Sequence, residues 1–119
     1  MGRRERGRLE AEVLQVLWSS GAALTAAEVR GALDPVPALT TVLTVLDRLT
    51  EKGEVRRDGE ALRGVRFVAT RSEQEHRSTA MTELLDASSD RVGTLLRFAG
   101  SLDDDELEVL RRALDERRG

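Results

Sequence analysis

A group of threonines followed by one arginine has the side chains best suited to contact a polyanion. Thr40, Thr41 and Thr44 lie close together, and Arg48 follows four residues after Thr44. Hydroxyl groups can donate hydrogen bonds to phosphate oxygens, a threonine methyl can touch a thymine methyl, and a guanidinium can bind guanine or phosphate. On the outward face of a helix, these side chains would form a surface for contacting DNA, although Asp47 and Glu51 on the same face would repel phosphate.

Four further arginines follow within a short stretch of alternating sequence. They are Arg56, Arg57, Arg63 and Arg66. On a β-hairpin, arginines can bind the phosphates that flank a groove. Charged side chains also protect exposed strand edges from pairing with other chains, so the cluster has a structural explanation as well.

Hydrophobic periodicity predicts the elements that must position these residues. Apolar residues at three- and four-residue spacing predict helices at about 8–19, 25–33 and 39–52, and alternation then predicts strands at 54–58 and 65–69. Thr25 and Glu28 form a capping box for the second helix, and Ala38 leaves the third helix poorly capped. This order of elements is typical of a winged helix-turn-helix, whose third helix enters the DNA major groove. A winged helix can also serve as a protein–protein interaction module.

The remainder of the chain predicts three more helices, with caps at Ser72, Asp90 and Asp103. Their apolar faces are larger than one small winged domain can cover. The residues on these faces that we expect to form a dimer interface are Met81, Leu84, Leu85, Leu95, Leu96, Phe98, Leu107, Leu110 and Leu114. The region has 48 residues, too few to bury a core alone. We therefore expect a homodimer; the alternative is an intramolecular helical cap in a monomer.

The charges are distributed unevenly along the chain. Residues 1–71 carry 12 basic and 10 acidic side chains, whereas residues 72–119 carry 7 and 12, within a total of −3. We predict a winged-helix DNA-binding domain at 1–71 and a helical dimerisation region at 72–119. The expected fold class is mainly α with a small β-hairpin.

Composition disfavours several classes of function. The 119 residues include no cysteine, which excludes disulfides, thiolate nucleophiles and cysteine metal sites. His76 is the single histidine, and we expect it to be solvated on a charged helix. The chain has no nucleophile–base pair and no phosphate-cradling loop, so we expect no enzyme activity, cofactor or metal. No apolar run approaches the ~20 residues that span a bilayer, so we expect a cytoplasmic protein without membrane insertion.

Residues 39–53 closely resemble the recognition-helix signature of the penicillinase-repressor family (BlaI/MecI/CopY type); they run LTTVLTVLDRLTEKG. Residues 9–18, which end in Trp18, and residues 24–29 are similar to the first two helices of that family. The resemblance extends over nearly the whole chain and is weaker in the C-terminal helices. It implies a homodimeric transcriptional repressor that binds a palindromic operator in double-stranded DNA, with Thr41, Thr44 and Arg48 as DNA contacts.

The chain departs from the family pattern at several places. Ala38 and Leu39 stand where the family commonly has an aromatic residue or Ser-Pro, and Phe67 stands where the wing usually has tyrosine. The absence of cysteine excludes the copper-sensing mechanism of some members. In the antibiotic-responsive members, a membrane sensor triggers cleavage in the C-terminal region. The matching segment here has Arg97 before Phe98 where those members have Asn. The resemblance thus leaves open whether a membrane sensor or protease acts as inducing partner, or whether a ligand binds in a pocket between the two regions.

Overall fold

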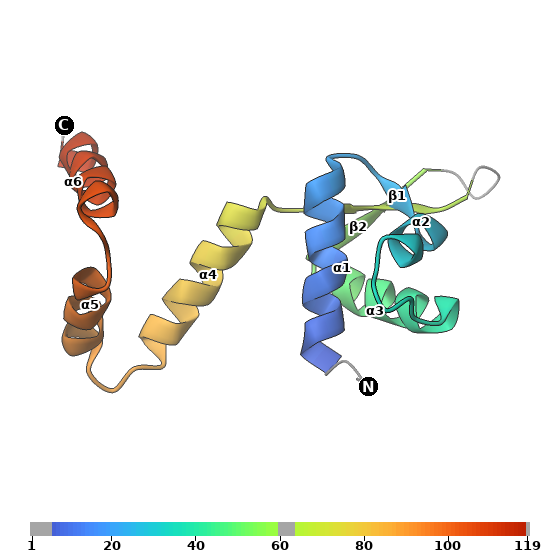
Figure 1. Ribbon diagram of the computed structural model, residues 1–119, viewed down its shortest axis with the longest axis horizontal. Helices are drawn as coiled ribbons and strands as arrows, with labels where there is room; N and C mark the ends of the chain where they lie inside the picture. The colour runs from blue at the N-terminus through green and yellow to red at the C-terminus, as the bar shows by residue number, and fades with distance from the viewer. Residues whose placement is uncertain (1–5, 60–63, 119) are drawn as a thin grey trace. The chain divides into compact units, whose positions relative to one another are not determined.

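The structure is a computed structural model that describes residues 6–59 and 64–118. The chain divides into two compact units, residues 1–76 and 77–119. Six helices and three short strands are present in the described residues (Figure 1). None of these helices is long and apolar enough to cross a membrane.

The first unit has the element order of a winged helix-turn-helix, which confirms the predicted fold class (Figure 1). Its elements are α1 (Arg6–Ser20), β1 (Leu24–Thr25), α2 (Ala26–Gly31), α3 (Leu39–Glu51), β2 (Val55–Asp58) and β3 (Arg66–Ala69). The sheet is antiparallel, with strand order β1-β3-β2. The prediction of a two-stranded hairpin was incomplete, because β1 pairs Leu24 with Phe67 and Thr25 with Arg66. A two-residue strand is too short to produce an alternating pattern.

The core of this unit is formed by apolar side chains from all three helices and the sheet. The predicted stripe on α3 is confirmed: Val42, Val45, Leu46 and Leu49 are all buried. Val13 from α1 and Val29 from α2 belong to the same cluster, together with Val55 and Phe67 from the sheet. This packing holds α3 in place despite its β-branched residues, which lower intrinsic helix propensity.

Local signals set the ends of these helices as expected. The Thr25 hydroxyl accepts a hydrogen bond from the Glu28 amide at 3.2 Å, and the Glu28 carboxylate accepts one from the Thr25 amide at 2.9 Å. Ala38 provides no side-chain cap to α3. Gly53 follows α3 with φ +78°, a left-handed conformation that glycine adopts readily, and the chain turns there into β2.

Three helices follow the sheet: α4 (Glu73–Asp86), α5 (Arg91–Gly100) and α6 (Asp104–Arg118). Their predicted caps are confirmed. Ser72 and Glu75 form a reciprocal pair, the Asp90 carboxylate accepts from the Gly93 amide at 2.9 Å, and Asp103 and Glu106 form a capping box. Each of these helices therefore begins directly after the residue whose side chain caps it.

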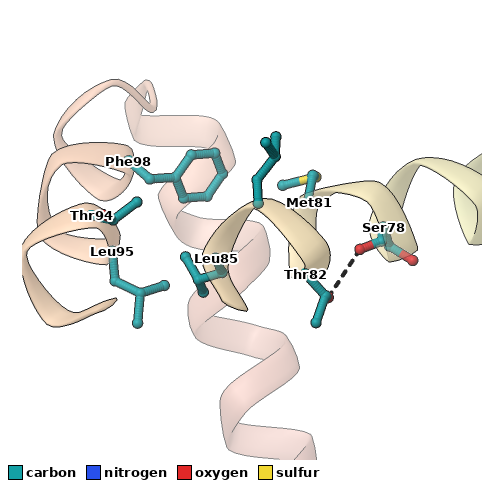
Figure 2. A pocket seen from close by; sticks show the side chains of 8 residues that line it. Ser78, Met81, Thr82, Leu85, Thr94, Leu95 and Phe98 are labelled. Atoms are coloured by element: carbon teal, nitrogen blue, oxygen red, sulfur yellow. Dashed lines mark hydrogen bonds between the residues drawn. The ribbon is translucent and has the colours of Figure 1, made fainter. Parts of the chain in front are cut away.

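The helices from α4 to α6 expose most of their apolar residues. In these three helices, all of whose residues the structure describes, no side chain is buried. An apolar groove of about 520 Å³ lies between α4 and α5. Figure 2 shows Met81 and Leu85 of α4 facing Leu95 and Phe98 of α5 across it. A single copy of this region therefore has no core of its own.

Candidate nucleic-acid interface

The outward face of α3 carries the threonines singled out by the sequence. Residues of an α-helix advance by roughly 100° each, so Thr40 and Thr44 point away from the buried stripe, and Thr41 and Arg48 share one flank. The three threonines are exposed and Arg48 is partly buried. The structure thus places all four predicted contact residues of α3 on one accessible surface.

The Thr44 hydroxyl proton is used in a hydrogen bond within α3. The hydroxyl donates to the backbone oxygen of Thr40 at 2.9 Å, one helical turn earlier. The side chain still offers a lone pair on its oxygen and an apolar methyl group. Those groups suit a base amino group or a thymine methyl better than a phosphate, which needs a donor.

Arg48 and Arg56 carry positive charges that are not neutralised by any group in the described part of the chain. Within the residues that the structure describes, neither guanidinium makes a hydrogen bond or an ion pair. Each can therefore bind an external anion or a base edge without first breaking a contact.

Arg57 reaches across to α3 instead. Its Nη2 lies 2.8 Å from Oδ1 of Asp47, and both side chains are exposed. The pair neutralises one of the two acidic groups on the outward face. An exposed pair of this kind is worth at most ~1 kcal/mol, so a phosphate can compete for the arginine.

Arg66 forms its contacts on the side of β3 that pairs with β1. Its Nη1 lies 3.1 Å from Oε1 of Glu28 and 3.4 Å from the backbone oxygen of Ala23. The Thr25 amide and hydroxyl, followed by the Arg66 guanidinium, lower the pKa of the Glu28 carboxyl. Arg66 therefore links the sheet to the start of α2.

The sheet register separates the arginines that the sequence placed on one hairpin. Arg57 lies opposite Phe67, on the face that meets the core, and the alternation of side chains places Arg56 and Arg66 on the other face. Arg63 lies outside the described residues. The wing arginines whose positions are described thus do not form a single patch, and Arg56 is the one without an internal partner in the described residues.

Arg30 was not identified from the sequence, although it shapes this surface. It lies in the last turn of α2, and its Nε donates to the backbone oxygen of Pro37 at 2.7 Å. The bond closes the connection that leads into α3. A basic residue at a helix C-terminus seven positions before a proline was the available signal, but nothing local indicated which carbonyl it would reach.

The expectation that His76 is simply solvated was wrong. Its Nδ1 lies 2.9 Å from Oε2 of Glu54, and its ring centroid is 5.2 Å from that of Trp18. Arg71 bonds the other carboxylate oxygen of Glu54, and Trp18 donates from Nε1 to the Arg71 backbone oxygen at 3.0 Å. These contacts fasten the first turn of α4 to α1 and to the turn after α3. The partners are far apart in sequence, so no local pattern revealed them.

Glu54→Gln is expected to destabilise the first unit by about 1.5–3 kcal/mol at pH 7, the range for hydrogen bonds to charged groups. Burial acts to raise the pKa of Glu54, but hydrogen bonds from His76 and Arg71 outweigh it and lower the pKa below the ordinary 4.5. Because the folded-state pKa is the lower one, this stability is present above about pH 4.5 and is lost as the pH falls through the folded value. The variant should therefore show a shallower loss of stability in acid.

Denaturant unfolding at pH 7 and at several pH values below 4.5 measures both effects. Glu51→Gln is the matched control, since Glu51 is a nearby exposed glutamate on α3. If the two variants give the same acid profile, the Glu54 contacts contribute nothing to stability.

A family model described as penicillinase repressor matches residues 6–116. Among curated proteins, the chain is 34% identical over 118 residues to the transcriptional regulator BlaI of Mycobacterium tuberculosis. That match covers 92% of this chain and 83% of the relative. The same values hold for strains CDC 1551 and H37Rv.

Two solved structures of MarR proteins are also similar. A MarR family protein from Bacillus stearothermophilus is 24% identical with a TM-score of 0.47, over 92% of this chain and 71% of that one. The oxidized form of MarR from E. coli is 24% identical with a TM-score of 0.48, over 94% and 75%.

Proposed function

This chain belongs to the penicillinase-repressor family, and on that premise we propose that it represses transcription as a homodimer bound to a palindromic operator. It is a DNA-binding transcriptional regulator and not an enzyme. In the proposal, residues 1–71 bind DNA, residues 72–119 join the two copies, and the protein acts in the cytoplasm. Each α3 enters the major groove of one half-site, with half-site centres ~10 base pairs apart or a multiple of that.

The surface of α3 is the observation that carries the DNA-binding part of the proposal. Thr40, Thr41 and Thr44 are exposed there, and Arg48 has no partner among the described residues. Hydroxyl, methyl and guanidinium groups match the edges of bases and the phosphates beside them. Arg56, Arg57, Arg63 and Arg66 complete the proposed set as contacts from the wing.

The absence of buried side chains in α4, α5 and α6 supports the homodimer. Leu84 is 74% exposed and Leu96 is 70% exposed in a single copy. Large exposed apolar surfaces mark interaction sites, and a second copy of the same region would cover them symmetrically. Two copies also double the phosphate contacts, which supply most of the affinity for DNA.

The release signal acts, in this proposal, on the contact between the two copies. Cleavage between Arg97 and Phe98 by a protease or sensor-linked partner would cut α5, which carries part of the proposed interface. A small molecule that separates the copies would have the same effect. Proteolytic fragments in induced cells would favour the first route, and thermal stabilisation of the purified protein by a ligand would favour the second.

Selection of bound genomic fragments by the purified protein tests the proposed function. We expect the recovered fragments to share an inverted repeat that the protein binds saturably, with affinity that falls steeply as salt rises. If no duplex binds saturably at physiological salt and the winged unit instead retains a protein partner, the protein is an interaction module and the proposal is wrong.

Asp47→Asn is expected to raise DNA affinity by about two- to fivefold, because Arg57 loses an internal competitor for phosphate worth at most ~1 kcal/mol. The same change removes one repelling charge from the outward face. Titration of an operator duplex at several salt concentrations should also show a steeper salt dependence. In an Arg57→Ala background, the gain from Asp47→Asn should shrink. A loss of affinity in the single variant would contradict this role.

A further inference from the structure

Two leucines of α3 remain exposed after the core is complete. Val42, Val45, Leu46 and Leu49 fill the buried stripe, and none of them is more than 4% exposed. Leu39 is 44% exposed and Leu43 is 39% exposed. Since they are four residues apart, the two leucines lie on the same flank of the helix. The packing of the first unit therefore does not explain why position 43 is a leucine.

Leu43 borders the proposed DNA-contacting face. At roughly 100° per residue, it lies about 60° from Thr40 around the helix axis and about 140° from Arg48. Leu43 therefore lies beside the exposed threonines, on the side of the helix that faces away from Arg48. A helix that enters the major groove with Thr40 and Thr44 foremost brings Leu43 against bases at a different position from those near Arg48.

The major groove offers a leucine one complementary group. Base edges there present hydrogen-bond donors and acceptors, and the apolar exception among the four bases is the C5-methyl of thymine. A leucine placed over a polar edge would leave that edge without a partner and cost affinity. A leucine placed over thymine buries both apolar groups and tolerates no other unmodified base equally well.

We propose that Leu43 is a specificity-determining residue that reads the C5-methyl of a thymine in each half-site. The proposal rests on the proposed function and adds to it the identity of one base. Burying one methyl group contributes about fourfold in affinity, so two half-sites contribute about sixteenfold. The Leu43 side chain has no hydrogen-bonding group, so removing it should affect this base position and leave the rest of the operator preference intact.

Selection from a random duplex library tests the proposal with three proteins: wild type, Leu43→Ala and Leu43→Met. Wild type and Leu43→Met, which keeps an apolar extension, should each recover sites with a fixed thymine in every half-site. Leu43→Ala should recover the same site with that position no longer specified. Equal preference for this thymine in all three proteins would overturn the proposal.

A uracil substitution then removes only the methyl group from the recovered duplex. Replacing that thymine by uracil in both half-sites should weaken wild-type binding about sixteenfold and Leu43→Ala binding less than twofold. Replacing the thymine·adenine pair by 5-methylcytosine·guanine keeps the C5-methyl in the major groove on a different base, and wild type should prefer that duplex to one with cytosine·guanine at the same position. If wild type binds thymine and uracil duplexes equally, Leu43 does not read the methyl although the protein still binds its operator. If no protein recovers a common site, the proposed function itself fails.

Discussion

Leu110→Asp is expected to convert the proposed dimer to a monomer and to lower operator affinity by at least about 100-fold. Leu110 is 44% exposed on α6 and lines a second apolar hollow of about 310 Å³ with Met81, Phe98 and Val109. In the proposed dimer, this surface is covered by the other copy. A carboxylate buried there has no partner, which costs several kcal/mol.

The effect on DNA binding follows from the loss of one of two linked contacts. Two half-sites bound by one dimer gain about 10²–10⁴ in affinity over a single half-site. A monomer keeps the threonine and arginine surface of α3 but contacts one half-site. It should therefore retain weak binding that no longer depends on the second half of the palindrome.

Sedimentation velocity and titration of the operator duplex measure the two outcomes, with circular dichroism to confirm that the helices persist. Arg112→Asp is the control on the same helix, because Arg112 points away from the apolar face and is 77% exposed. The control should remain dimeric. If Leu110→Asp also remains dimeric, the interface does not include this face of α6.

Arg48→Ala is expected to cost about 1–3 kcal/mol of specific affinity if its guanidinium binds a base edge. The structure provides no internal partner for Arg48 among the described residues, so the substitution should leave the stability of the fold nearly unchanged. Titrations of the operator and of a random duplex separate the two roles. A loss confined to the operator indicates base contact, and an equal loss on both indicates a phosphate contact.

Two further variants sharpen this result. Arg48→Lys keeps the charge and loses the two parallel donors of the guanidinium, so it should not recover operator affinity if Arg48 binds a base edge, and should recover binding to both duplexes if Arg48 binds a phosphate. Arg56→Ala removes the arginine of β2 that has no partner among the described residues, and should weaken both duplexes alike. If Arg48→Ala changes neither titration, Arg48 does not belong to the interface.

Local chemistry made much of the fold predictable from the sequence. Two capping boxes form between residues three positions apart, namely Thr25 with Glu28 and Asp103 with Glu106. Their spacing in the sequence is therefore enough to predict them. The buried stripe of α3 repeats with the helical period for the same reason. The outward position of Thr40 and Thr44 followed from that stripe, because the two faces of one helix are linked by its geometry.

Contacts between residues distant in the chain were decided by the tertiary structure alone. The sequence placed Arg57 and Arg66 on one basic hairpin, but packing pairs them with Asp47 and Glu28, 10 and 38 residues away. His76 likewise reaches Glu54 across 22 residues. The sequence determined which side chains are charged and where helices start. Which charged groups pair with each other depends on how the helices and strands pack around the core. Among the predicted DNA contacts whose positions the structure describes, that packing leaves the guanidinium groups of Arg48 and Arg56 without a partner.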